Sequence, residues 1–250
     1  MNPHQHEEII RNWRRYKLPF ENEPSLVKTF AGGKTNRSYL LQADSKLWVL
    51  RVGSDVEHLG VNRAREFTIQ AAVAEIQLAP RILHKNSEPD FWLTEYIPGK
   101  IYTALSDDKI TALFDALAKI RQLPLELPVF DYNQQLKILS GKNKLDDNLS
   151  RALETLNTYG ATGLCHHDLN PNNVIFNGDR PTIIDWEYAA VGMVEMDFAS
   201  VLLEWKIPLQ TISALTGAHP SLLEAACEVY QALCQFWEQR QGIALASKPS

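Results

Sequence analysis

The sequence has few cysteines, no excess of basic residues and no long apolar run. Cys165, Cys227 and Cys234 are an odd number without a Cys-x-x-Cys pair, so the sequence indicates neither a disulfide framework nor a zinc site. The formal net charge is -5, and mixed charges leave no basic stripe for nucleic acid. No segment holds the roughly 18 apolar residues of a membrane span, and the beginning lacks the apolar core of a signal peptide. We therefore expect a cytoplasmic protein with reduced thiols, no nucleic-acid partner and no membrane insertion.

The chain is long enough to bury a substantial core, because 250 residues with 45% hydrophobic content suit one large domain or two small lobes. Residues 26–52 hold two runs of aromatic and branched residues around Gly32 and Gly33, which favours a hairpin. Residues 64–76 repeat apolar positions near helical spacing, and two strand-like runs follow. The first part of the chain therefore predicts a small sheet with one main helix.

Beyond Gly99 the pattern becomes helical. Residues 105–123, 144–160 and 220–241 each repeat apolar positions on one helical face. The sequence predicts a sheet-rich lobe over residues 1–96, a short hinge, and a helical lobe over residues 97–250, with a cleft between the lobes.

One short polar run carries the chemistry. "CHHDLNPNNVIF", residues 165–176, is followed after a few residues by "PTIIDWEY", residues 181–188. A carboxylate such as Asp168 can orient a substrate hydroxyl and accept its proton, while Asn173 and Asp185 offer the hard oxygen ligands that magnesium prefers. For the other asparagines of the run, Asn170 and Asn172, an Asx-rich turn is the favoured interpretation. The complete pattern indicates phosphoryl transfer, which needs positioning and charge neutralisation more than covalent chemistry.

The same residues resemble a known superfamily. "HHDLNPNN" followed by "IIDWEYA" is similar to the catalytic segment of aminoglycoside phosphotransferases and choline kinases, and "DWEYA" looks most like the choline, ethanolamine and thiamine kinase branch. The resemblance implies a bilobal, protein-kinase-like α+β fold, with ATP as co-substrate and magnesium as cofactor. It implies that Asp168 is the catalytic aspartate, that Asn173 and Asp185 bind magnesium, and that His166 holds the loop by hydrogen bonds. His167 occupies a variable position, so no role is assigned to it.

The resemblance also places the nucleotide site in the amino-terminal lobe. "AGGKTN", residues 31–36, is similar to the turn that covers the phosphates, although an ordinary hairpin turn would contain such glycines too. Arg51 stands where protein kinases carry lysine, and Glu66 matches its acidic partner; two solvated surface charges are the alternative. Glu95 and Ile97 would offer backbone groups to adenine. The residues implied in nucleotide binding are Gly32, Gly33, Thr35, Asn36, Arg51, Glu66, Glu95 and Ile97.

The acceptor is implied to be a small cationic alcohol of the choline, ethanolamine or thiamine type. Glu204 matches the carboxylate that faces the ammonium group in choline kinases, and aromatic residues would complete a cage. The residues implied in substrate binding are Glu187, Tyr188, Glu204, Trp205 and Trp237. Core packing is the alternative for Trp237.

Other functions stay open. An aminoglycoside kinase or another small-molecule kinase is the alternative enzyme, and a pseudokinase that binds without turnover is the alternative of another class. A protein kinase is disfavoured, because no Ala-Pro-Glu end of an activation segment follows Asp185. The sequence does not indicate an oligomeric state.

Overall fold

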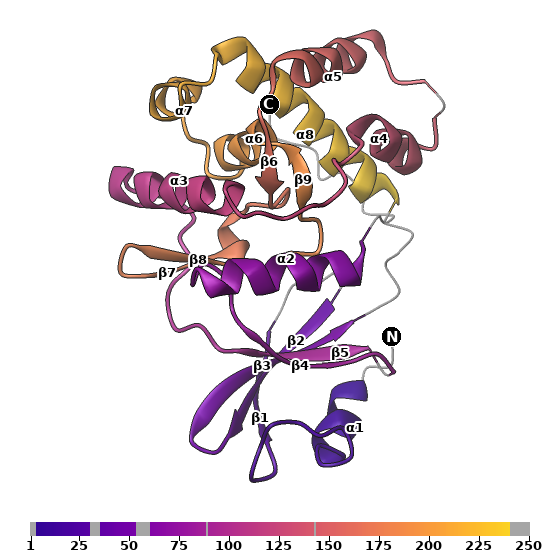
Figure 1. Ribbon diagram of the computed structural model, residues 1–250, viewed down its shortest axis with the longest axis vertical. Helices are drawn as coiled ribbons and strands as arrows, with labels where there is room; N and C mark the ends of the chain where they lie inside the picture. Colours follow the sequence, from indigo (N-terminus) through magenta and orange to yellow (C-terminus); the bar gives the residue numbers. More distant parts are fainter. Residues whose placement is uncertain (1–3, 31–35, 54–60, 89, 143, 241–250) are drawn as a thin grey trace.

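The computed structural model describes residues 4–30, 36–53, 61–88, 90–142 and 144–240, and these form two lobes (Figure 1). One lobe is a β-sheet with two helices, and the other consists mainly of helices. The predicted α+β arrangement of a small antiparallel sheet and a larger helical part is confirmed. The lobe boundary between residues 96 and 97 stays a prediction.

The amino-terminal sheet has five antiparallel strands in the order β1-β2-β3-β5-β4. The tight turn between β2 and β3 consists of Asp44 and Ser45, both at positive φ, which matches the right-handed twist of a two-residue hairpin. The strands are β1 (Ser25–Thr29), β2 (Asn36–Ala43), β3 (Lys46–Gly53), β4 (Ile82–Asn86) and β5 (Phe91–Glu95).

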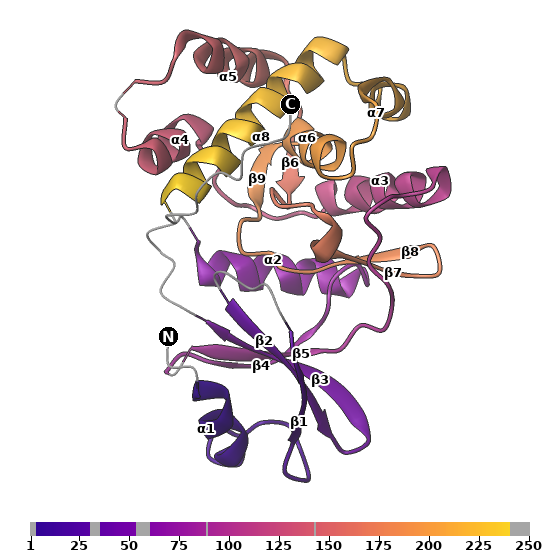
Figure 2. The same ribbon diagram turned by 180° about the vertical axis from the view of Figure 1, so that it is seen from behind.

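Two helices accompany this sheet. The short helix α1 (Gln5–Arg11) lies against the sheet through Ile9, and the sequence pattern gave no indication of it. The predicted main helix is α2 (Arg63–Glu75), whose first turn is capped by the Asn62 side chain. Figure 2 shows α2 running between the sheet and the helical lobe, and Glu66 is among its buried residues.

The carboxy-terminal lobe is built around the long helix α8 (Pro220–Arg240), which packs against α4, α5 and α6. Buried aliphatic residues such as Leu156 and Val229 fill the space between these helices. The other helices of this lobe are α3 (Asp107–Arg121), α4 (Tyr132–Ser140), α5 (Asp147–Tyr159), α6 (Glu195–Glu204) and α7 (Leu209–Thr216). The predicted helices 105–123, 144–160 and 220–241 correspond to α3, α5 and α8. None of the helices among the described residues is long and apolar enough to cross a bilayer.

Two short two-stranded sheets position the polar run. β6 (Thr162–Cys165) pairs with β9 (Ala190–Met193), and β7 (Val174–Asn177) pairs with β8 (Arg180–Ile183). The loop that contains Asp168 connects β6 to β7, with a 3-10 turn over Pro171–Asn173, and Asp185 follows β8. The loop enters β7 at the end where β8 stops, because Val174 pairs with Ile183, so the two aspartates lie at the same end of the β7–β8 pair.

The segment that connects the two lobes, around Gly99 and Lys100, is hydrogen-bonded to the β7–β8 hairpin. Lys100 and Phe176 exchange two backbone hydrogen bonds of 2.9 and 2.8 Å. A Cβ atom at Gly99 would come within 2.6 Å of the Phe176 carbonyl oxygen, so this crossing requires glycine. The connection between the lobes is therefore held at a fixed point beside the polar run.

Candidate active site

The Asp168 carboxylate is held by two amide groups of its own loop. Asn173 Nδ2 donates to Asp168 Oδ2 at 2.9 Å, and Asn170 Nδ2 donates to Oδ1 at 3.1 Å. Burial, and after it the negative charge of Asp185, raises the pKa of Asp168 to about 7. A carboxylate that is fixed in place and titrates near neutral pH is suited to accept a proton.

His166 connects this loop to the segment before Asp185. It is buried, its Nε2 donates to the Ile184 carbonyl at 3.0 Å, and its Nδ1 accepts from the Asp168 N–H at 3.3 Å. Burial lowers the pKa of His166 to about 4, so the ring is neutral. The loop-holding role stays a prediction, and these two bonds support it.

His167, to which the sequence assigned no role, is part of the same framework. Its φ of 66° is a backbone conformation that is uncommon outside glycine. Its Nδ1 donates to the Tyr188 carbonyl at 3.1 Å, and its Nε2 accepts from the Tyr132 hydroxyl at 2.6 Å. The buried Asp197 carboxylate accepts the backbone N–H groups of His166 and His167. These bonds fix the path of the chain immediately before Asp168.

Asp185 contacts an arginine of the amino-terminal sheet. It lies at a φ of 67° after β8, and Arg51 Nη2 on β3 donates to its Oδ1. Arg51 Nη1 is 3.9 Å from Glu66 Oε1 on α2. Arg51, Glu66 and Asp185 are thus brought together, and their predicted roles in nucleotide and magnesium binding stay predictions.

A second arginine, which the sequence reading missed, lies closer to Glu66. Arg63 Nη1 is 2.6 Å from Glu66 Oε2 and 3.5 Å from Glu187 Oε2. The Asn36 side chain donates to Glu187 at 3.0 Å and accepts from Arg63. The buried Glu187 side chain therefore contacts residues of the amino-terminal lobe. It also borders a cavity in the carboxy-terminal lobe.

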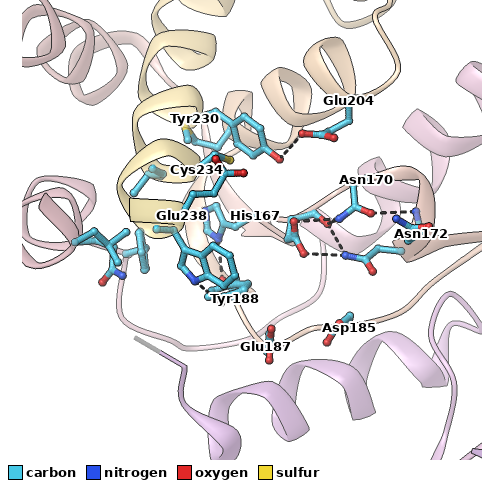
Figure 3. A pocket seen from close by; sticks show the side chains of 18 of the residues that line it. His167, Asn170, Asn172, Asp185, Glu187, Tyr188, Glu204, Tyr230, Cys234 and Glu238 are labelled. Atoms are coloured by element: carbon cyan, nitrogen blue, oxygen red, sulfur yellow. Dashed lines mark hydrogen bonds between the residues drawn. The ribbon is translucent and has the colours of Figure 1, made fainter. Parts of the chain in front are cut away.

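A cavity of about 490 Å³ opens beside Asp168, between the loop that connects β6 to β7 and helices α4, α6 and α8 (Figure 3). Tyr230 donates to Glu204 at 3.3 Å, and the Trp237 indole donates to the Tyr188 hydroxyl at 2.9 Å. No lysine or arginine is among the described residues that line it. Its acidic and aromatic lining residues are Asp168, Asp185, Glu187, Glu204, Glu238, Phe130, Tyr188, Tyr230 and Trp237.

The cavity contains most of the residues that the resemblance implied for the substrate, but not Trp205. That residue is 6% exposed in the core of the lobe, and its indole donates to the Tyr102 carbonyl at 2.7 Å. Trp205 directly follows Glu204, so its side chain leaves the helix end in another direction. Phe130 and Tyr230 were not predicted; the spacing of Tyr230 and Trp237 on α8 was the available signal.

The structure describes only some of the residues that are predicted to bind the nucleotide. Gly32, Gly33 and Thr35 lie outside the described residues. The Glu95 N–H donates to the Arg81 carbonyl at 3.2 Å, so it is not available to adenine. The prediction that backbone groups contact adenine therefore concerns the Glu95 carbonyl and Ile97. Among the described residues, no group of three or more His, Cys, Asp or Glu side chains that could hold a metal is found.

The fold and the site together define a protein of the protein-kinase-like class. The chain belongs to the phosphotransferase enzyme family, whose model matches residues 26–242. The predicted superfamily and the predicted class of enzyme, a phosphotransferase, are thereby confirmed.

Three relatives illustrate the similarity. Protein LicA of Haemophilus influenzae is 24% identical over 218 residues, which cover 79% of this chain and 61% of LicA, so the chain spans less than two thirds of that protein. The choline kinase LicA from Streptococcus pneumoniae superposes with a TM-score of 0.71 at 19% identity, covering 96% of this chain and 94% of the other. A structure of LicA in complex with AMP superposes with a TM-score of 0.69 at 18% identity, covering 98% of this chain and 94% of the other. At these identities the structural likeness shows the fold alone.

Proposed function

We propose that the protein is an ATP- and magnesium-dependent kinase that phosphorylates the hydroxyl group of a small cationic metabolite of the choline, ethanolamine or thiamine type. The observation that carries the proposal is the acidic and aromatic lining of the cavity beside Asp168. The names of the LicA relatives, one of which is a choline kinase, agree with this class of acceptor.

The cavity suits a cation for two physical reasons. Aromatic faces attract a desolvated ammonium group by about 2 kcal/mol. A carboxylate such as Glu204 adds Coulomb attraction, which strengthens when water leaves the cavity. Asp168 borders the same cavity, so a hydroxyl group on a cation bound there comes within reach of the proposed base.

The chain's own groups fit a magnesium-nucleotide complex. Asn173 uses its amide nitrogen for Asp168, so its amide oxygen points away from that carboxylate and, with Asp185, would hold the ion. Magnesium is typically bound by one or two carboxylates together with substrate phosphates. When bound, the ion would neutralise the charge that develops on the transferred phosphoryl group. The LicA complex with AMP supports the use of a nucleotide.

A larger polycation such as an aminoglycoside is the second candidate. A cavity of about 490 Å³ lies within the range that accepts drug-sized ligands, and it exceeds what a small alcohol fills. The carboxylates at its rim, including Glu238, would suit several ammonium groups. The two candidates differ in acceptor size and share the same chemistry at Asp168.

Glu204 provides the test of the cationic acceptor. Glu204→Gln keeps the shape of the side chain and removes its charge, so the Michaelis constant for choline should rise by roughly ten-fold, about 1.4 kcal/mol, while that for ATP stays constant. Initial rates at varied choline and varied ATP measure both constants.

Glu228→Gln is the matched control, because Glu228 is an exposed residue of α8 and lies outside the cavity lining. The control should leave both constants unchanged. If Glu204 only ties its helix to Tyr230, then Glu204→Gln would lower the melting temperature and shift both constants together. That result, or an unchanged choline constant, would count against a cationic acceptor.

A further inference from the structure

The Tyr132 side chain joins the start of helix α4 to two other parts of the carboxy-terminal lobe. Tyr132 is the first residue of α4 and is only 3% exposed. Its hydroxyl accepts the Met193 N–H of β9 at 3.0 Å and donates to His167 Nε2 at 2.6 Å. One buried hydroxyl group therefore connects α4 and β9 to the residue that precedes Asp168.

His167 continues this chain of hydrogen bonds to the cavity beside Asp168. Its Nδ1 donates to the Tyr188 carbonyl at 3.1 Å, and the residue borders the cavity (Figure 3). Burial lowers the pKa of His167 to about 4, so the ring is neutral and has one donor and one acceptor. The Tyr188 carbonyl takes the donor, and the Tyr132 hydroxyl fills the acceptor. The Tyr188 hydroxyl also accepts the Trp237 indole N–H, so the hydrogen bonds lead from α4 to the aromatic wall of the cavity.

Strand β9 leaves room for this contact at one glycine. A Cβ atom at Gly192 would lie 2.2 Å from the Tyr132 hydroxyl and 2.8 Å from His167 Nε2. His167 itself has a φ of 66°, a conformation that residues other than glycine keep only where their surroundings hold them in it. The contact between the hydroxyl and the imidazole therefore supports a strained backbone directly before Asp168.

We infer that Tyr132 is a positioning residue for the proposed phosphoryl transfer: through His167, its hydroxyl holds the Asp168 carboxylate at a fixed distance from the cavity wall where the acceptor binds. This inference rests on the proposed function for the role of Asp168. Without the hydroxyl, His167 Nε2 loses its hydrogen-bond donor, so the ring can turn and the backbone before Asp168 can relax. A small displacement of the base from the acceptor hydroxyl lowers the rate of the chemical step.

The binding of both substrates should depend little on Tyr132. Glu204, the proposed partner of the acceptor cation, is hydrogen-bonded to Tyr230 and not to this hydroxyl. The residues that are predicted to bind ATP lie within the first 97 residues of the chain. Tyr132→Phe should therefore lower the turnover number by about tenfold and change the Michaelis constants for acceptor and ATP by less than about threefold.

The test is a double-mutant cycle on the turnover number. Choline, ethanolamine, thiamine, a neutral sugar and an aminoglycoside are supplied one at a time with ATP and magnesium, and the acceptor with the highest wild-type rate is used for Tyr132→Phe, His167→Asn and the double variant. Asparagine tolerates the left-handed backbone at residue 167, and its shorter side chain does not bridge Tyr132 and Tyr188. Tyr132→Phe should cost about tenfold in the wild type but less than about threefold beside His167→Asn. Tyr159→Phe is the matched control and should leave turnover unchanged, because Tyr159 is 75% exposed at the end of α5.

Hydrogen exchange adds a measurement that does not depend on activity. The backbone amides of residues 166–168 should exchange at least about tenfold faster in Tyr132→Phe, whereas those of α5 should not change.

The outcomes separate positioning from a general loss of structure. Unchanged turnover, with or without a lower melting temperature, would show that Tyr132 only stabilises the fold and would overturn the inference. Equal losses in both backgrounds would also overturn it, because the hydroxyl would then act without His167. If Tyr132→Phe does not fold, His167→Asn decides: it should show the same tenfold loss, and near-normal turnover overturns the inference. Wild-type protein that phosphorylates no acceptor would refute the proposed function; faster exchange would then still support the hold on Asp168, and unchanged exchange would overturn both.

Discussion

Asp168→Asn is expected to lower turnover by about two orders of magnitude or more while leaving the affinity for magnesium-nucleotide nearly unchanged. The reason is that the Asp168 carboxylate would orient the acceptor hydroxyl and accept its proton, which an amide cannot do. Single-turnover rates with saturating choline and ATP measure the loss, and calorimetry measures nucleotide binding. Asp179→Asn, in the exposed turn of the β7–β8 hairpin, is the control and should behave as the wild type.

The pH dependence of kcat/KM is a second test of Asp168 as the catalytic base. Burial raises the pKa of Asp168 to about 7, and the base must be deprotonated to act, so kcat/KM should increase as the pH rises through about 7 and level off above it. Because the pKa in the folded state lies above the unfolded value near 3.8, this group favours folding at low pH, and that contribution is lost as the pH rises toward 7. Near-normal turnover of Asp168→Asn would show that Asp168 does not accept the proton of the acceptor hydroxyl.

Asp185→Asn is expected to weaken the binding of magnesium-nucleotide by roughly a hundredfold, about 2.8 kcal/mol, and to lower the rate as well. The substitution removes a charged oxygen from the site that would hold the ion, and it also removes the carboxylate that Arg51 contacts. Titrations of the nucleotide with and without magnesium measure the effect. Wild-type affinity should depend strongly on magnesium, whereas that of the variant should be nearly the same in both conditions.

Asp179→Asn serves as the control here too, since it removes one carboxylate far from the cleft. A variant at position 185 that retained the full magnesium-dependent gain in affinity would show that another residue holds the ion. The proposed roles of Asn173 and Asp185 would then both have to be reassigned.

The elements that sequence reasoning predicted well are those with strong local signals. The helix α8 repeats apolar positions over 21 residues, and the segment around Asp168 combines turn residues with flanking strands, so both are visible in a short window. Helix α1 was not indicated, because seven residues give too few turns for a period to stand out. The local pattern thus predicted the architecture of the two lobes, but not every element that covers the sheet.

The residues that sequence reasoning missed depend on contacts between distant segments. Arg63 and Glu187 are 124 positions apart, and nothing in the first turn of α2 shows that its arginine reaches the other lobe. The role of His167 depends on a left-handed backbone conformation and on the Tyr132 hydroxyl, neither of which has a local signal. Trp205 was expected in the cavity beside Glu204, and only its packing in three dimensions places it in the core.

The most direct measurement of the central claim follows phosphorus by nuclear magnetic resonance in a mixture of the protein, ATP and magnesium. Choline, ethanolamine and thiamine are supplied one at a time, with a neutral sugar and an aminoglycoside in parallel. The proposed function predicts a new phosphomonoester resonance with at least one small cationic alcohol, dependent on magnesium and reduced by about a hundredfold or more in Asp168→Asn. Phosphate transfer to the neutral sugar in preference to every cation, or no transfer to any acceptor, would contradict it.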